Sequence, residues 1–252
     1  MVCKVHLSQK PELHNPVLIV GLPGIGFVAN ISALHLIDEL NAQLFGEITS
    51  SAFQDLAVST EKGTPLSPLN QLYFYQGSGQ ERDLIIWYGN TQALTTFGQY
   101  ELCGRVLDTV QDLGCRYAVT VGGFKVDESK EEPQVYCAAS DPETLEEALS
   151  LDTKVMVGQI FGLAGITIGL AQLRKLKAFS LLVETVGKEP DSEAARRALL
   201  ALSKFLGLSL DVTDLGKATE QTREMLESFG IIRKGIKKEK KERDKSQFRW
   251  YI

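Results

Sequence analysis

Short, continuously apolar runs that end at or near glycine recur along this chain, and they limit its fold more than any other feature. They lie at residues 16–21 (PVLIVG), 82–89 (RDLIIWYG), 115–124 (CRYAVTVGGF) and 178–187 (AFSLLVETVG). Such runs are typical of strands buried on both faces of a sheet. Helical patterns of ten to twenty residues separate them. The alternation predicts an α/β fold, a three-layer α/β/α arrangement in which helices cover both faces of a mixed, largely parallel sheet.

Local signals place the helices between these runs. Gly114 is expected to end one helix as its C-cap, and Asp141 is expected to cap another that begins at Pro142. The expected helices cover about 25–40, 95–113, 142–151, 191–206 and 214–232. The remaining strands are expected near 44–53, 56–60, 70–76 and 134–140. No internal repeat is visible in the sequence.

Nineteen residues without a charge, 155–173, lie between Lys154 and Arg174. Their length alone would fit a membrane-spanning helix. However, four glycines interrupt the segment, and Gln159 and Gln172 lie inside it. The glycine spacing also suits close helix packing. We therefore expect a buried strand end, a glycine-rich loop and a packed helix rather than a membrane span.

The bulk composition indicates a soluble globular protein of the cytoplasm. Of the 252 residues, 44% are apolar and 23% are charged, which is ordinary for such proteins. The N-terminal stretch lacks the apolar core of a signal peptide. The four cysteines are scattered without C-x-x-C spacing, so neither a zinc site nor a disulfide framework is expected.

Charge is distributed unevenly along the chain. Residues 233–249 hold nine Lys or Arg against three acidic residues, a net charge of +6, which leaves −11 on the remainder of a chain whose total is −5. The apolar periodicity also stops at Arg233. These shifts predict an α/β domain over residues 1–232 and a basic tail over 233–252 that is either a flexible linker or a solvated helix.

The tail ends in large apolar side chains, Phe248, Trp250, Tyr251 and Ile252. A charged linker cannot bury them, so they require an explanation. They are either a chance ending, a tail that folds back onto its own domain, or a docking peptide. A docking peptide has a physical basis, because a terminal carboxylate and an aromatic anchor are readily captured in a pocket. We favour docking through Trp250, Tyr251 and Ile252.

Glycine-rich turns at two strand ends suggest a second function. The turn Gly21–Gly26 follows a strand and opens a helix, which is the context of a phosphate cradle. Its spacing, G-x-x-G-x-G, is not that of the dinucleotide fingerprint, and Pro23 removes an N–H donor. The Gly122–Gly123 pair ends another strand. Tight turns are the favoured interpretation of both, and a nucleoside- or nucleotide-binding enzyme of phosphorylase or ligase type is the alternative.

No catalytic set emerges from the remaining residues. Glu184 and Thr185 end a strand, but no partner for a lone carboxylate is evident. The three histidines share no motif spacing, and His35 is expected to be partly buried on the first helix. We therefore expect no catalytic residues, no cofactor and no metal. Binding of nucleic acid by the basic tail is disfavoured because it lacks interleaved aromatics and the acidic body would repel phosphates.

The last three residues resemble the hydrophobic-Tyr-any (HbYX) motif of proteasome activators. In that motif the tail enters a pocket between neighbouring α-subunits of the core particle, and its carboxylate meets a pocket lysine. The resemblance implies that Trp250 is the hydrophobic anchor, that Tyr251 moves the gate and that Ile252 carries the carboxylate.

The body resembles the proteasome assembly chaperone family, in its archaeal form related to the second eukaryotic assembly chaperone. The matching stretches lie within residues 10–230 and are Gly21–Gly26, Val121–Gly123, Gly162–Leu173, Leu181–Thr185 and Asp191–Ala195. The resemblance implies a fold similar to nucleoside phosphorylases, no recognised active site and homo-oligomers, some of which carry an activator-type tail. We therefore expect a non-enzymatic, ATP-independent proteasome activator or assembly chaperone.

Overall fold

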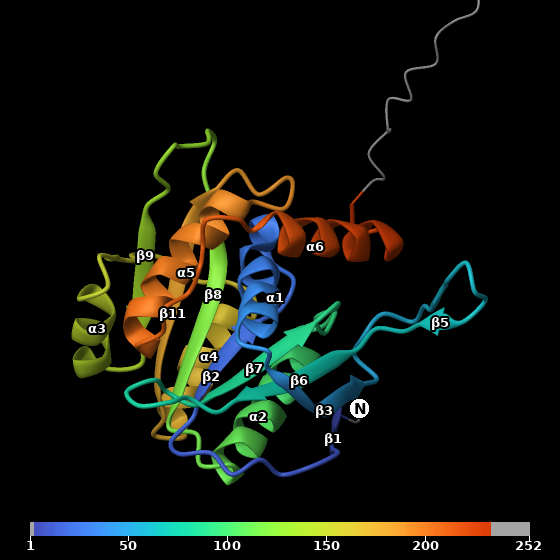
Figure 1. Cartoon of the computed structure of the whole chain (residues 1–252), viewed down its shortest axis with the longest axis horizontal. Helices are drawn as coiled ribbons and strands as arrows, with labels where there is room; N and C mark the ends of the chain where they lie inside the picture. The colour runs from blue at the N-terminus through green and yellow to red at the C-terminus, as the bar shows by residue number, and fades with distance from the viewer. Residues whose placement is uncertain (1–2, 233–252) are drawn as a thin grey trace, which may run out of the picture.

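A nine-stranded sheet runs through residues 3–232, the part of the chain that the computed structural model describes (Figure 1). Its strand order is β1-β3-β6-β7-β2-β8-β11-β9-β10. The strands are β1 (Cys3–Leu7), β2 (Val17–Gly21), β3 (Gln43–Ser50), β6 (Asn70–Tyr75), β7 (Leu84–Gly89), β8 (Tyr117–Lys125), β9 (Val135–Ala139), β10 (Lys154–Val155) and β11 (Lys177–Thr185). A separate ribbon, β4 (Val58–Ser59) paired with β5 (Pro65–Leu66), extends from the body as an arm (Figure 1).

The centre of the sheet is parallel and its flanks introduce antiparallel pairs. Strands β7, β2, β8 and β11 run parallel to one another. On one side β1, β3, β6 and β7 pair antiparallel, and on the other side β9 pairs antiparallel with β11. The predicted mixed sheet is confirmed, and the glycine-ended apolar runs are its four central strands. Their continuous apolar character follows from burial on both faces.

Helices cover both faces of the sheet. The helices are α1 (Val28–Glu39), preceded by the short 3₁₀ helix η1 (Ile25–Phe27), α2 (Thr96–Asp112), α3 (Pro142–Leu149), α4 (Gly162–Leu173), α5 (Ser192–Leu206) and α6 (Gly216–Ser228). Helices α1, α3, α5 and α6 pack on one face, whereas α2 and α4 lie behind the sheet in Figure 1. The predicted α/β/α layering is confirmed.

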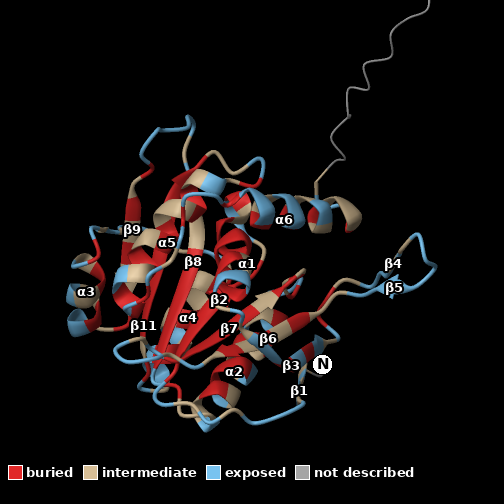
Figure 2. Ribbon diagram, viewed as in Figure 1, coloured by how far each residue is buried: buried red, intermediate tan, exposed pale blue. Residues whose placement is uncertain are grey.

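Alternate residues of the central strands point to opposite faces of the sheet. Each set belongs to the hydrophobic core between the sheet and the helices on that face. Ile19 of β2 points toward α1 and α5, whereas its neighbour Leu18 points toward α2. Both are fully buried, as is Trp87 of β7, whose indole N–H donates to Asn70 Oδ1 at 2.9 Å. Figure 2 shows this buried sheet between its helical layers. Because each strand is buried on both faces, the strand ends are fixed and can position turns accurately.

Several boundaries differ from the expectations. Strand β1 was not predicted, because Cys3–Leu7 alternates half-buried and exposed residues at the sheet edge and has no apolar run. Helix α6 ends at Ser228 rather than near residue 232. The expectation of a buried strand end in the charge-free segment is wrong, since Val155 and Val157 are exposed. None of the helices in residues 3–232 is long and apolar enough to cross a membrane.

Candidate functional site

Two turns and the last part of β8 meet at the carboxyl ends of the parallel strands β2, β8 and β11. The turns are Gly21–Gly26 and the one that follows Thr185. The prediction of a turn at Gly122–Gly123 is wrong, because β8 continues through both glycines to Lys125 and pairs them with Leu182 and Val183 of β11. A Cβ placed at Gly123 would overlap the carbonyl oxygen of Ile25 and lie 2.7 Å from Thr185 Cγ2. A Cβ at Gly26 would lie 2.7 Å from Thr185 Oγ1. The glycines therefore let the turns pack against one another, and they leave no cradle between them.

Thr185 and Asp191 connect these turns by hydrogen bonds. The Thr185 hydroxyl donates to Asp191 Oδ2 at 2.6 Å and accepts from the backbone N–H of Gly187 at 3.1 Å. The other carboxylate oxygen of Asp191 caps α5 by accepting from Ala194 N at 3.0 Å. The backbone N–H of Asp191 donates to the Gly26 carbonyl at 2.9 Å. Asp191 thus caps α5, which was expected to open at Asp191 or Ser192, and it also holds the Gly21–Gly26 turn in place.

A hollow of about 220 Å³ lies beside the turns, under the N-terminus of α4. Its polar side chains have protein partners: the Thr120 hydroxyl bonds Ser180 at 2.6 Å, and the Gln92 amide donates to the Pro23 carbonyl. The first residues of α4 also border the hollow, and no side chain caps this helix. The rest of the wall is apolar side chains and glycine backbone. No lysine or arginine from residues 3–232 lines it. The hollow therefore offers a phosphate the N-terminus of α4 but no cationic side chain from the described residues.

Glu184 is a buried carboxylate whose oxygens are all engaged. Lys130 Nζ lies 2.7 Å from Oε1, the Tyr136 hydroxyl donates to Oε1 at 3.3 Å, and the backbone N–H of Gln134 donates to Oε2 at 3.0 Å. Burial would raise the pKa of Glu184, but the Lys130 and Gln134 hydrogen bonds outweigh burial and lower this pKa. The side chain is therefore an anchor for the β8–β9 loop and not a free base.

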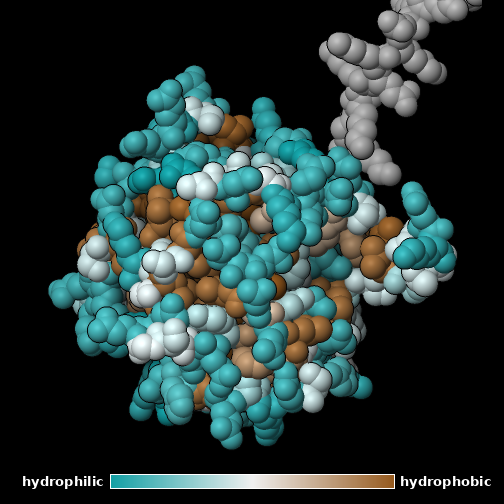
Figure 3. Space-filling view, viewed as in Figure 1, coloured by the Kyte–Doolittle hydropathy of each residue, from teal (hydrophilic) through white to brown (hydrophobic). Residues whose placement is uncertain are grey.

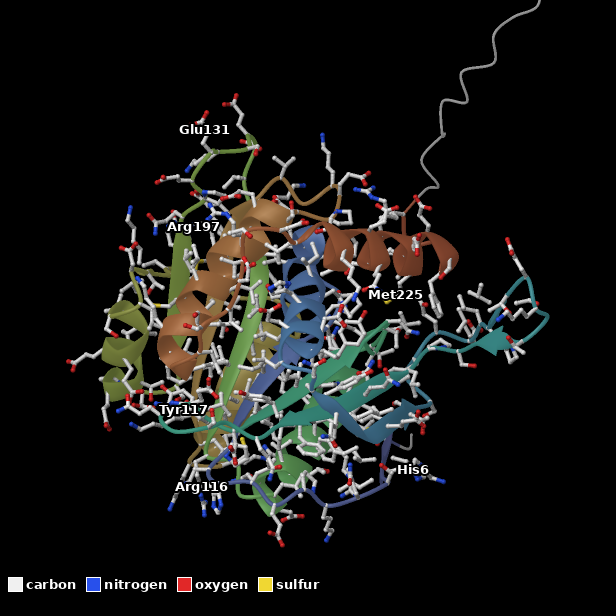
Figure 4. The ribbon with its side chains drawn as sticks, viewed as in Figure 1. His6, Arg116, Tyr117, Glu131, Arg197 and Met225 are labelled. Carbon is white, nitrogen blue, oxygen red and sulfur yellow. The ribbon has the colours of Figure 1, made fainter. Side chains whose placement is uncertain are left out.

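A second anchor holds the same loop. Arg197 of α5 donates from Nε to the carbonyl of Pro133 at 3.3 Å. Figure 4 shows Arg197 below the loop that carries Glu131. Glu184 and Arg197 therefore both hold the β8–β9 loop against the body.

His35 and the four cysteines are candidate reactive groups, to be judged by their burial and contacts. His35 is buried as expected, and its Nε2 lies 2.8 Å from the Asp211 carbonyl. The four cysteines are free thiols, and Cys103, Cys115 and Cys137 are buried. Residues 3–232 contain no group of three or more His, Cys, Asp or Glu side chains that could hold a metal ion.

Large apolar side chains are also exposed on α2, α4 and the segment before α4, next to the hollow beside the turns. Tyr100, Phe161 and Leu173 border an open hollow of about 800 Å³ there. The sequence interpretation missed this surface because it assigned the charge-free segment 155–173 to the interior. The absence of charge was the signal, but it does not distinguish a buried helix from one that a partner covers.

The predicted docking residues lie outside the described part of the chain. Trp250, Tyr251 and Ile252 follow the last described residue, 232, by about twenty positions, and their docking role stays a prediction. Helix α6 packs against α1 and leads to the start of this segment. The division into a 1–232 domain and a 233–252 tail likewise stays a prediction.

Comparison with known proteins identifies relatives for the body. The family model described as PAC2 family matches residues 18–229. An uncharacterized protein of Methanocaldococcus jannaschii is 29% identical over 219 residues, which are 86% of this chain and 84% of the relative.

Two solved structures from Pyrococcus furiosus are similar over nearly the whole body. PbaB, described as an archaeal proteasome activator, superposes with a TM-score of 0.81 at 34% identity, over 90% of this chain and 98% of PbaB. PbaA, described as an archaeal homolog of proteasome-assembly chaperone, gives a TM-score of 0.74 at 28% identity, over 89% of this chain and 95% of PbaA.

Proposed function

Because the chain belongs to the PAC2 family, we propose that it is a proteasome activator or assembly chaperone that docks its C-terminus on the core particle. Its relatives PbaB and PbaA are described as a proteasome activator and as an assembly-chaperone homolog. The observation that carries the docking mechanism is the terminal sequence Trp250-Tyr251-Ile252 behind a linker of net charge +6. The protein acts in the cytoplasm as a homo-oligomer, without ATP and without an enzymatic reaction of its own.

Each terminal residue has a distinct role in this mechanism. Trp250 supplies a large apolar anchor, and Tyr251 supplies a ring with a hydroxyl donor. The carboxylate of Ile252 pairs with a lysine in a pocket between α-subunits of the core particle. If the preceding seventeen or so residues behave as a flexible coil, they span about 25 Å, which lets the anchor search for its pocket.

The decisive experiment measures binding and peptidase activity with purified core particle. Immobilised core particle is titrated with the full chain, with a chain lacking residues 250–252, and with the Tyr251→Ala variant. Loss of an interface aromatic anchor costs about 2 kcal/mol or more, so both changes are expected to weaken binding by at least about thirtyfold. Hydrolysis of a fluorogenic peptide in the same samples separates gate opening from binding alone.

A matched control uses the same end of the chain. Phe248→Ala removes an aromatic side chain that lies outside the terminal tripeptide, and it is expected to leave binding within a few-fold of the wild-type value. Unchanged binding after deletion of residues 250–252 would show that the tail does not dock. Mixing the protein with dissociated α-subunits and following ring formation distinguishes the assembly role from activation.

The alternative, a nucleoside- or nucleotide-binding enzyme, has no supporting observation at the strand-end turns. Thr185 and Ile25 fill the space beside Gly26 and Gly123, where a phosphate would have to lie. The adjacent hollow is lined mainly by apolar groups. Thermal-shift measurements with nucleosides, phosphate and nucleotides test it directly. A melting-temperature increase that persists after removal of residues 250–252 would favour this alternative.

A further inference from the structure

A continuous apolar surface covers the outer side of α2 and α4; we call it the α2–α4 surface. Its exposed large side chains are Leu94, Phe97, Tyr100, Val155, Val157, Phe161 and Leu173. The most exposed are Val157 at 87%, Phe161 at 80% and Leu173 at 79%. Helices α2 and α4 pack side by side, and residues from both border the same 800 Å³ hollow. Of the seven exposed side chains, Tyr100, Phe161 and Leu173 border this hollow, and the other four lie at the start of α2 or on the stretches of chain that lead into α2 and α4.

The α4 half of this surface lacks the charges that keep an exposed helix in water, and charge appears only beyond its end, where Arg174 pairs with Asp108 of α2 at 2.8 Å. No charged residue occurs in 155–173, yet only Leu163, Thr167 and Ala171 of α4 are buried. Helices on the opposite face differ: α5 and the chain near α6 expose ion pairs such as Arg196–Glu193 and Arg223–Glu189. Figure 3 shows hydrophilic residues spread over that opposite face. The contrast indicates that the α2–α4 surface is not built to face solvent.

The glycines of α4 separate into two kinds. A Cβ at Gly165 would overlap the carbonyl oxygen of Ile160, so contacts within the chain explain this glycine. A Cβ at Gly169 would have no atom within 4 Å, although glycine in an exposed helix is less favourable than alanine. Close approach of another backbone would explain Gly169, because a missing side chain lets two backbones pack tightly.

The exposed apolar area is large enough for a stable interface. With roughly 150 Å² for each fully exposed large side chain, the seven residues expose on the order of 700 Å². The largest apolar patch of a typical monomer is about 300–600 Å², and each partner in a stable complex buries about 800 Å². The α2–α4 surface thus exceeds what a monomer usually leaves in solvent and approaches one side of an interface.

We propose that the α2–α4 surface is the interface through which copies of this chain associate with one another. An apolar surface of this size needs a partner that is present whenever the chain is, and a second copy meets that condition. Obligate homo-oligomer interfaces are also the most apolar class, whereas contacts with transient partners are more polar. The net charge of −5 makes copies repel one another, and the uncharged segment 155–173 is where they approach at least cost. This inference rests on the homo-oligomer of the proposed function and assigns its interface.

The test compares the mass in solution of two charge-inserting variants. Leu173→Glu places a carboxylate on the α2–α4 surface, and Leu66→Glu places one at an exposed leucine of the arm, away from that surface. Light scattering coupled to gel filtration at about 10 µM is expected to give a multiple of the 27.8 kDa chain mass for the wild type and for Leu66→Glu. Leu173→Glu is expected to elute as a 27.8 kDa monomer with an unchanged far-UV circular dichroism spectrum.

Two outcomes would overturn the inference: a monomeric wild type at this concentration, or a Leu173→Glu variant with the wild-type mass. Leu173→Ala guards against a folding defect, because it shortens an exposed side chain without adding charge. It is expected to raise the concentration of half-dissociation by about fivefold or more. An unchanged half-dissociation concentration would count against the assigned interface.

The docking role of residues 250–252 and the α2–α4 interface can be refuted independently of each other. A chain without residues 250–252 is expected to keep its oligomeric mass while losing the core particle. If the truncated chain still binds the core particle, the docking role is refuted and the interface proposal is unaffected. If Leu173→Glu stays oligomeric while the truncated chain loses binding, the interface falls and the docking role stands.

Discussion

The strand-end turns can be tested by adding one methyl group, in the Gly123→Ala variant. The added Cβ would overlap the carbonyl oxygen of Ile25 and sit 2.7 Å from Thr185 Cγ2. Neither group can yield cheaply. Ile25 belongs to η1, which leads into α1, and the Thr185 hydroxyl is bonded to Asp191. If the glycine exists for packing, this substitution must push apart β8 and the Gly21–Gly26 turn.

The expected cost follows from the size of the overlap. Overpacking by a methyl group costs about 1–3 kcal/mol, and an overlap with backbone places Gly123→Ala near the upper end, at about 2–3 kcal/mol. A chain of this size loses about 2–4 °C of melting temperature per kcal/mol. Thermal unfolding followed by circular dichroism is therefore expected to shift downward by roughly 5–10 °C.

Gly122→Ala is a matched control on the adjacent residue of β8. Its Cβ would meet only the Cδ2 atom at the end of the Leu182 side chain, at 3.2 Å, and that side chain can move. The melting temperature of Gly122→Ala is expected to stay within about 3 °C of the wild type, since any crowding is offset by the lower entropy of the unfolded chain. Equal shifts for the two variants, or none for Gly123→Ala, would refute the packing explanation of the turn.

Three further predictions concern the groups around these turns. Asp191→Ala removes the α5 cap and the partner of Thr185, and urea unfolding is expected to show a loss of about 1–2 kcal/mol. The lowered pKa of Glu184 stabilises the fold above the unfolded-state pKa of about 4.3, and this stability is lost as the pH falls through the lower folded-state pKa. The stability difference between wild type and Glu184→Gln should therefore shrink between pH 6 and pH 3, and a constant difference would contradict this assignment. Burial raises the pKa of the Cys103 and Cys115 thiols to about 11, so Ellman's reagent at pH 8 is expected to label them rapidly only in urea.

Much of the fold is evident in the sequence because the central strands are buried on both faces. Burial of this kind requires unbroken apolar runs, and glycine ends the β2 run where that strand turns into a helix. The glycines of β8 do not end it, since the strand continues to Lys125 and is followed by β9. Helix caps are equally local: Asp141 accepts from Thr144 N at 2.9 Å, and Asp191 accepts from Ala194 N. The Asp141 cap was predicted, and Asp191 was one of two residues, with Ser192, expected to open its helix, because a cap depends on residues two or three positions away.

Features that depend on distant contacts were not predictable in the same way. The role of Gly123 depends on Ile25, about a hundred residues earlier in the chain, so the sequence suggested a turn where the structure has a continuous strand that packs closely against Ile25. The edge strand β1 gains its stability from pairing with β3 and has no apolar run of its own. The exposure of α4 is a third case, because burial inside a fold and burial under a partner demand the same apolar residues.

The proposed interface and the proposed tail are expected to depend on each other in binding. One chain offers one terminal tripeptide, and one anchor of this size gives modest affinity. Several tails on one oligomer bind with an avidity about 10²–10⁴ times higher than a single tail, provided that their linkers reach neighbouring pockets. Leu173→Glu keeps Trp250, Tyr251 and Ile252 intact, yet it is expected to bind immobilised core particle at least about a hundredfold more weakly than Leu66→Glu. A synthetic peptide of residues 233–252 should match the affinity of the Leu173→Glu monomer. If the monomer instead binds as tightly as the wild type, a single tail is sufficient, and the oligomer serves some purpose other than presenting several tails at once.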